Sequence, residues 1–302
     1  MKKHVWLMSV LIVTVLGTWI GIAQGQLTGH YPLGSEGIKA ATLPPPGLYL
    51  RNYNSFYRAT TFKDRSGKSS GLGLDLTAFA FVPRLIWISE HKFLGADYGA
   101  DMLVPLIYTD FELNTVGVKD NDFYLGDICL EPVDLAWHGA QYDIGAALAV
   151  WMPTGKYNKN KPASPGKDFW TTMFTFGGTY YFDTEKTLSA SILGRYEIHS
   201  EMDHKDMKPG NNVLFEWGVG KALTETVEMG MAGYCQWQLT DDSGSDITWD
   251  KSIHDRVAGI GPEVSVFIPP AKMFLSCRAA WEFSAVDRPE GTTVTLTLTK
   301  PF

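Results

Sequence analysis

The sequence predicts an all-β fold: a transmembrane, antiparallel, up-and-down β-barrel of about twelve strands, preceded by an extended arm rich in Pro and Gly. Two observations lead to this expectation. Apolar and polar side chains alternate along segments long enough to cross a bilayer, and the connections between these segments are alternately long and short. A third observation agrees with them, because the last segment alternates in the same way and ends in the aromatic residue Phe302.

The alternation is clearest over residues 140–152 and 187–199. In the first of these segments, an apolar face that runs from Tyr142 to Met152 opposes a small and polar face that includes Asp143. A period of two residues is that of a strand, and about 9–11 residues suffice for a strand to cross a membrane. Because a soluble barrel has the same alternation, the other features of the chain must decide between the two settings.

The N-terminal residues predict a signal peptide followed by an arm. Residues 1–25 contain two early lysines, the apolar run Val5–Ile22, and small residues at the cleavage site Ala23–Gly25. An apolar run of this length also suits a retained membrane anchor, but the small residues favour cleavage. Residues 26–46 end in Pro44–Pro46, which excludes a helix or a central strand and predicts an extended arm or a plug of the barrel.

Residues 47–302 are expected to form the barrel. The expected strands are 47–62, 72–89, 92–109, 122–137, 140–152, 169–182, 187–199, 211–222, 226–240, 255–268, 272–284 and 291–302. Long, polar connections are expected at 63–71, 110–121, 153–168, 200–210, 241–254 and 285–290, and short ones at 90–91, 138–139, 183–186, 223–225 and 269–271. Outer-membrane barrels have this layout, with short periplasmic turns, long external loops and an even number of strands.

The end of the chain adds a signal for assembly. The segment GTTVTLTLTKPF alternates apolar residues with threonines before Phe302. It resembles the final strand of bacterial outer-membrane proteins, which ends in an aromatic residue and is recognised by the barrel-insertion machinery. Together with the signal peptide, this resemblance predicts that the mature protein lies in the outer membrane of a Gram-negative bacterium, in contact with its lipid.

The hairpin over residues 123–157 carries a more specific resemblance. Gly126-Asp127 is followed by strand residues and Pro132, then by an alternating strand and the turn Met152–Tyr157. Together with the opening stretch His30–Asn54, these motifs resemble the outer-membrane family named for the MetA pathway of phenol degradation. The resemblance covers most of the mature chain. It implies a channel linked to hydrophobic or aromatic compounds, with no established set of catalytic residues.

Composition and motifs argue against several other classes of protein. The formal charge of −7 disfavours nucleic-acid binding. The three cysteines show neither metal-ligand spacing nor the even count of a disulfide framework. No nucleophile elbow, HExxH motif or phosphate loop is present, so no enzymatic activity, cofactor or metal is expected. The acidic stretch Asp241–Asp246 lacks the spacing of an EF-hand and is expected to be an exposed loop.

The polar faces of the strands supply the candidate residues of the lumen. The candidate ligand-binding residues are Asp143, Arg195, Glu197, His199, Glu263, Arg278 and Glu282, with Tyr49, Tyr53 and Tyr57 on one face of the first strand. Either the arginines neutralise neighbouring carboxylates, or the acids form a constriction that prefers cations. The tyrosines form either an aromatic ladder for an apolar solute or an ordinary row of cross-strand packing.

The expected function is the passive passage of small, hydrophobic or aromatic molecules through the lumen or through a lateral opening. One alternative is an outer-membrane enzyme that acts on lipid, since outer-membrane phospholipases are barrels with a Ser/His pair. His199 shares its strand with Ser189 and Ser191, but this spacing is not a catalytic motif. The other alternative is a structural or adhesive barrel whose external loops bind a partner.

Overall fold

The computed structural model describes residues 28–302, so the expected signal peptide lies outside the described residues. The strands of the described chain are β1 (Gly47–Phe62), β2 (Leu74–Phe93), β3 (Ala96–Leu103), β4 (Leu106–Leu113), β5 (Val118–Leu125), β6 (Ile128–His138), β7 (Tyr142–Met152), β8 (Thr171–Tyr181), β9 (Leu188–His199), β10 (Asn212–Ala222), β11 (Val227–Gln238), β12 (Arg256–Ile268), β13 (Met273–Val286) and β14 (Pro289–Pro301). A short 3-10 helix, η2 (Pro269–Ala271), joins β12 to β13. Among these described residues, no helix is long and apolar enough to cross a membrane.

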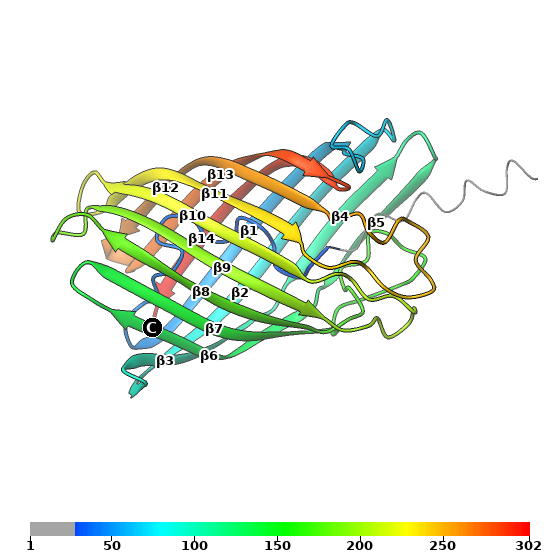
Figure 1. Cartoon of the computed structure of the whole chain (residues 1–302). Coiled ribbons are helices and arrows are strands. Elements are labelled where there is room, and N and C mark those ends of the chain that lie inside the picture. The colour runs from blue at the N-terminus through cyan, green and yellow to red at the C-terminus, as the bar shows by residue number, and fades with distance from the viewer. Residues whose placement is uncertain (1–27) are drawn as a thin grey trace, which may run out of the picture.

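The sheet closes on itself as an antiparallel barrel (Figure 1). Of the fourteen strands, β4 and β5 form a branch, and the other twelve make the wall in the order β1-β2-β3-β6 and then consecutively to β14. The last strand pairs with the first from Tyr49↔Pro301 to Phe62↔Pro289. In hydrocarbon, an unpaired N–H or C=O has no water to bond, so closure removes the edges that an open sheet would expose. The expected barrel of about twelve strands is therefore confirmed.

The branch arises where the third expected strand, 92–109, is interrupted. Its two parts, β3 and β4, both pair with β2, and Val104-Pro105 separates them. Proline has no N–H to donate to the ladder, which explains a break at this point. Beyond the break, β4 pairs with β5 along its whole length. The expected long loop 110–121 is consequently reduced to residues 114–117, and Figure 1 shows the β4–β5 hairpin projecting from the barrel.

Two expected connections also differ from those in the structure. Glu90–His91 continues β2, and the turn follows at Leu94-Gly95, where φ is 51° and 79°. Positive φ at both central residues suits the primed turns that match the twist of a hairpin. The expected long loop 285–290 is the two-residue connection Asp287-Arg288, because β13 and β14 extend into it. Polar composition therefore overestimated the length of this loop.

The two faces of the wall separate apolar from polar side chains. On β8, the outward Phe174 and Phe176 are 49% and 66% exposed, whereas the inward Thr171 and Met173 are buried. The outward side chains of the neighbouring strands are similarly apolar, as at Ile192. Such a surface suits hydrocarbon, and the polar side chains of the alternate positions are left facing the lumen.

Candidate functional site

The segment Thr28–Pro46, here called the arm, lies inside the barrel (Figure 1). It forms no strand of the wall, so its backbone amides need other acceptors. Carboxylates of the wall supply them at 2.9–3.0 Å: Glu197 of β9 for His30 and Tyr31, Glu216 of β10 for Glu36, and Glu263 of β12 for Ile38. Carboxylates of the lumen therefore bind the arm through its backbone amides.

Further contacts of the arm come from other sides of the barrel. They join Lys39 to Glu228 of β11, Thr42 to Asp143 of β7, and the carbonyls of Gly34 and Ser35 to Arg278 of β13. Lys167, in the β7–β8 loop, donates to the carbonyl oxygens of Thr28 and Gly29. Burial lowers the pKa of Lys167 to about 8. Only a segment within the lumen can contact so many strands at once.

Tyr31 places a phenol ring in a seat on the lumen wall. Its ring packs against a buried apolar cluster formed by Tyr53, Val82, Leu103, Cys129, Ala149, Trp151 and Met173. The guanidinium carbon of Arg195 lies 3.9 Å from the centre of the ring, and the phenol hydroxyl donates to Oε2 of Glu216 at 2.7 Å. A cation over an aromatic face and a hydrogen bond to a carboxylate are both favourable. These residues, here called the Tyr31 seat, therefore recognise both the ring and its hydroxyl.

Glu36 ties the middle of the arm to the first two strands. Its carboxylate accepts hydrogen bonds from the Tyr53 hydroxyl at 2.6 Å, from Nη1 of Arg51 at 3.2 Å and from Nη1 of Arg84 at 3.4 Å. The Glu36 side chain is 13% exposed. Charge-assisted hydrogen bonds at low exposure are the stronger kind, so Glu36 is a strong anchor of the arm.

A hydrogen-bond chain anchors the start of the arm at the loop end of the barrel. His30 contacts Oδ2 of Asp127 through Nε2 at 2.9 Å and the Thr171 hydroxyl through Nδ1 at 2.7 Å. The same hydroxyl contacts Nδ1 of His199 at 2.7 Å. One assignment satisfies every group: His30 donates to Asp127, Thr171 donates to His30, and His199 donates to Thr171. Burial lowers the pKa of His30 to about 4, although its bond to Asp127 opposes the shift.

This chain has the order carboxylate, imidazole and hydroxyl that nucleophilic hydrolases use. Its hydroxyl is not accessible, because Thr171 and the neighbouring Phe169 are both 0% exposed. The ring of Phe169 lies against both His30 and His199, with centroids 4.7 and 5.2 Å away. A substrate cannot reach this hydroxyl in the structure, so the geometry suits an anchor rather than a catalytic site.

The structure places the candidate lumen residues in separate groups. Arg195 pairs with Glu216 at 2.5 Å, and Arg278 pairs with Glu263 at 3.0 Å. Each arginine thus neutralises a neighbouring carboxylate, as one of the two interpretations expected. Asp143 contacts Thr42, Tyr181 and His138. Glu282 contacts Tyr57 and Tyr234, and Tyr49 donates to the Pro45 carbonyl. No single pocket gathers all ten candidates among the described residues.

The three tyrosines of β1 point inward, but their hydroxyls have different partners. Tyr49 donates to the arm, Tyr53 donates to Glu36, and Tyr57 donates to Glu282 at 2.7 Å. Of the three, Tyr53 belongs to the apolar cluster against which Tyr31 packs. A continuous ladder of rings is absent from these positions, and hydrogen bonding accounts for their common parity.

Several residues of the site were missed from the sequence. Arg51 has the same parity on β1 as the inward tyrosines, which is a signal that would have found it. Arg84 and Glu36 carried no comparable signal, because their roles depend on each other's position. Asp134 was assigned no role, since strict alternation from Glu131 points it outward. A register shift between Leu130 and Val133 reverses this parity, and Asp134 is buried.

The fold and the lumen define a class of protein: a transmembrane β-barrel of the outer-membrane type, whose polar lumen holds part of its own chain. The sequence matches the family model described as "Putative MetA-pathway of phenol degradation" over residues 59–298. The chain therefore belongs to this family, as its motifs predicted.

Solved structures of outer-membrane barrels resemble the whole fold. An outer membrane channel from Pseudomonas putida F1 is 14% identical with a TM-score of 0.75, and the match covers 91% of this chain and 100% of that one. The beta domain of the Bordetella autotransporter BrkA is 11% identical with a TM-score of 0.51, covering 85% and 99% of the two chains. A search of curated proteins found no match. At these identities the likeness concerns the fold.

Proposed function

We propose that the protein is an outer-membrane channel for the passive passage of small aromatic and hydrophobic compounds. The observation that carries this proposal is the Tyr31 seat, because it holds a phenol ring inside the lumen. The seat offers an apolar wall, the Arg195 guanidinium over the ring and the Glu216 carboxylate for the hydroxyl. A free phenolic compound presents the same groups as the tyrosine side chain. The description of the family, with its reference to phenol degradation, agrees with this solute class.

Passage requires the arm to leave the seat. Every contact described between the arm and the wall is non-covalent, so the arm can leave without breaking a bond. When Tyr31 leaves the seat, the apolar cluster, Arg195 and Glu216 are exposed to the lumen. A solute then binds, is released on the other side, and moves down its own gradient. The binding free energy of a small ring with one hydroxyl is modest, on the order of 4 kcal/mol, which corresponds to a millimolar dissociation constant. Weak binding of this kind favours release over trapping.

The test uses the current through single barrels in planar bilayers. Tyr31→Ala empties the seat while the rest of the arm keeps its anchors. Phenol is expected to interrupt the current of this variant in proportion to its concentration, and cyclohexanol, which lacks the aromatic face, is expected to do so far less. Replacing Arg195 with Ala in the same background should weaken the interruptions by phenol. Tyr49→Ala, which removes another inward tyrosine, is the matched control for the first variant.

Two results would contradict the proposal. An absence of current in both the wild type and Tyr31→Ala would favour a structural or adhesive barrel. Equal interruption by phenol and cyclohexanol, unaffected by Arg195→Ala, would leave a channel but remove the aromatic seat from its mechanism. Location in the outer membrane is tested separately by fractionation and by heat-modifiable migration in gels, and recovery from the soluble periplasm would refute it.

A further inference from the structure

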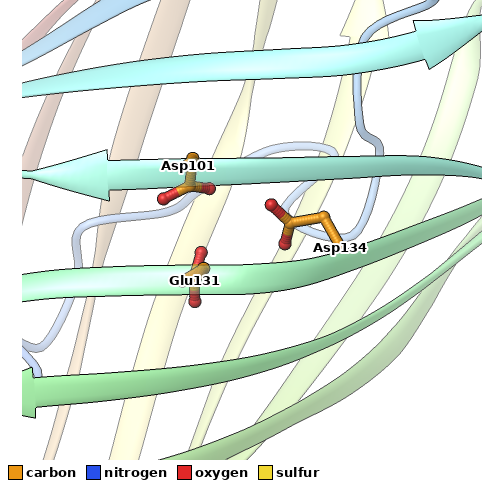
Figure 2. Close-up of side chains that lie close together, drawn as sticks. All are labelled: Asp101, Glu131 and Asp134. Atoms are coloured by element: carbon orange, nitrogen blue, oxygen red, sulfur yellow. The ribbon is translucent and has the colours of Figure 1, made fainter.

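Three acidic side chains meet on the wall of the lumen next to the Tyr31 seat, because Arg195 of the seat lines the same cavity as Glu131 and Asp134. Asp101 of β3 lies directly opposite Glu131 of β6, and Asp134 follows on the same strand (Figure 2). One oxygen atom from each carboxylate lies within 4.8 Å of the other two. The register shift of β6 between Leu130 and Val133 brings Glu131 and Asp134 together, because a bulge turns these two acids, three residues apart, to the same face.

The carboxylates are buried, and the protein leaves part of them without partners. Asp101, Glu131 and Asp134 are 4%, 5% and 2% exposed. Arg84 donates to Oδ2 of Asp101 and to Oε2 of Glu131 at 2.9 and 2.5 Å. Within the described chain, Oδ1 of Asp101 and Oδ2 of Asp134 are buried and accept no hydrogen bond. A buried carboxylate oxygen without a partner is costly, so these two atoms require either a bound proton or a cation.

Charge and space around the cluster agree with a cation. A cavity of about 50 Å³ is lined by Glu131 and Asp134 of the wall and by Glu36 of the arm. The acids there are Glu36, Asp101, Glu131, Asp134 and Glu216, and the bases are Arg51, Arg84 and Arg195. With every one of these groups ionised, five carboxylates and three guanidinium groups leave a formal charge of −2. A single divalent cation would neutralise it.

We propose that Asp101, Glu131 and Asp134 form a binding site for one Ca²⁺ ion in the lumen. The free oxygens of Asp101 and Asp134 and one oxygen of Glu131 supply the protein ligands. Ca²⁺ takes 6–8 oxygen ligands in flexible geometry, and a space of about 50 Å³ accommodates the water molecules that complete the set. Mg²⁺ demands a smaller and more regular octahedron, which an irregular group on two strands does not favour.

The ion would act on the wall rather than on the solute. Asp101 and Glu131 are a like-charged pair directly across two strands, an arrangement that destabilises a sheet. Arg84 bonds both of them and also Glu36 of the arm. Binding of the cation therefore stabilises the β3–β6 pair and leaves Arg84 available to the arm.

The experiment measures Ca²⁺ binding to the full-length protein in detergent, after removal of divalent ions with EDTA and in the presence of sodium chloride. Isothermal titration calorimetry is expected to give one ion per chain. Asp134→Asn should weaken binding by at least about tenfold. Asp143→Asn is the matched control, because Asp143 is also an inward, buried carboxylate, but its oxygens are bonded to Thr42, Tyr181 and His138.

Retention of affinity by Asp143→Asn together with its loss in Asp134→Asn would support the site. Absence of Ca²⁺ binding by the wild type, or equal binding by Asp134→Asn, would overturn it, and the second result would place the ion elsewhere, as at the external Asp241–Asp246. Heat-modifiable migration verifies that each variant is folded. If Asp134→Asn does not fold, the wild-type protein still tests the proposal. Ca²⁺ must raise the temperature at which the folded band is lost from the gel more than Mg²⁺ at the same concentration does.

Discussion

Replacing Glu36 with Gln removes one negative charge from a strong anchor of the arm, with almost no change of shape. Gln retains a carbonyl oxygen, but the bonds from Tyr53, Arg51 and Arg84 are no longer made to a carboxylate. Arg84 keeps Asp101 and Glu131 as partners, whereas the partners that Arg51 keeps are the uncharged hydroxyls of Thr299 and Tyr53. The main cost of the substitution is therefore the loss of the carboxylate partner of Arg51.

The size of the effect follows from the burial of this pair. Breaking a buried ion pair costs about 3–5 kcal/mol, and the Arg51 and Glu36 side chains are 22% and 13% exposed. The lower end of that range, about 3 kcal/mol, therefore applies to the docking of the arm. Since 1.4 kcal/mol is a factor of ten, the fraction of molecules with an undocked arm is expected to rise roughly 100-fold.

Hydrogen–deuterium exchange of the folded protein in detergent measures this fraction directly. Amides of the arm, such as those of Glu36 and Ile38, are bonded to wall carboxylates and exchange when the arm undocks. Glu282→Gln provides the control, because Glu282 is a lumen acid that bonds Tyr57 and Tyr234 rather than the arm. Exchange in the arm that is equally slow in Glu36→Gln and in the control would refute the reasoning.

Three further predictions follow from particular residues. The pKa of His30 is about 4 in the folded protein and 6.5 without burial, so its contribution of about 3 kcal/mol is present above pH 6.5 and is lost as the pH falls through 4. The protection factors of the arm amides, which correct for slower intrinsic exchange at low pH, should fall over this range, and the same fall in His30→Gln would contradict the assignment. Phe176→Arg puts a charge at the middle of an outward strand face and should lower the free energy of unfolding in bilayers by about 2–4 kcal/mol. Urea titration measures this change, and an unchanged midpoint would argue against lipid at this face. Deletion of Phe302, which is 74% exposed, should reduce assembly in cells without preventing refolding in detergent, and normal assembly would remove it from the insertion signal.

The sequence by itself determined the class of the fold and the direction of most side chains. Alternation with a period of two follows directly from strand geometry, so the inward positions of Asp143, Arg195 and Glu197 were correctly predicted. The number of strands in the barrel wall could be predicted because alternately long and short connections separate the alternating segments. The Pro- and Gly-rich composition of residues 26–46 likewise excluded them from the wall.

Only the tertiary structure decided which inward residues meet. The contact of Arg84 with Glu36 joins residues 48 positions apart, and a strand pattern holds no information about such a pairing. A single bulge in β6 was enough to reverse the direction of Asp134 and to create the acidic cluster. The seat of Tyr31 depends on strands from both halves of the barrel. Alternation specifies the face of a side chain, but its partner is fixed only when the sheet closes around the arm.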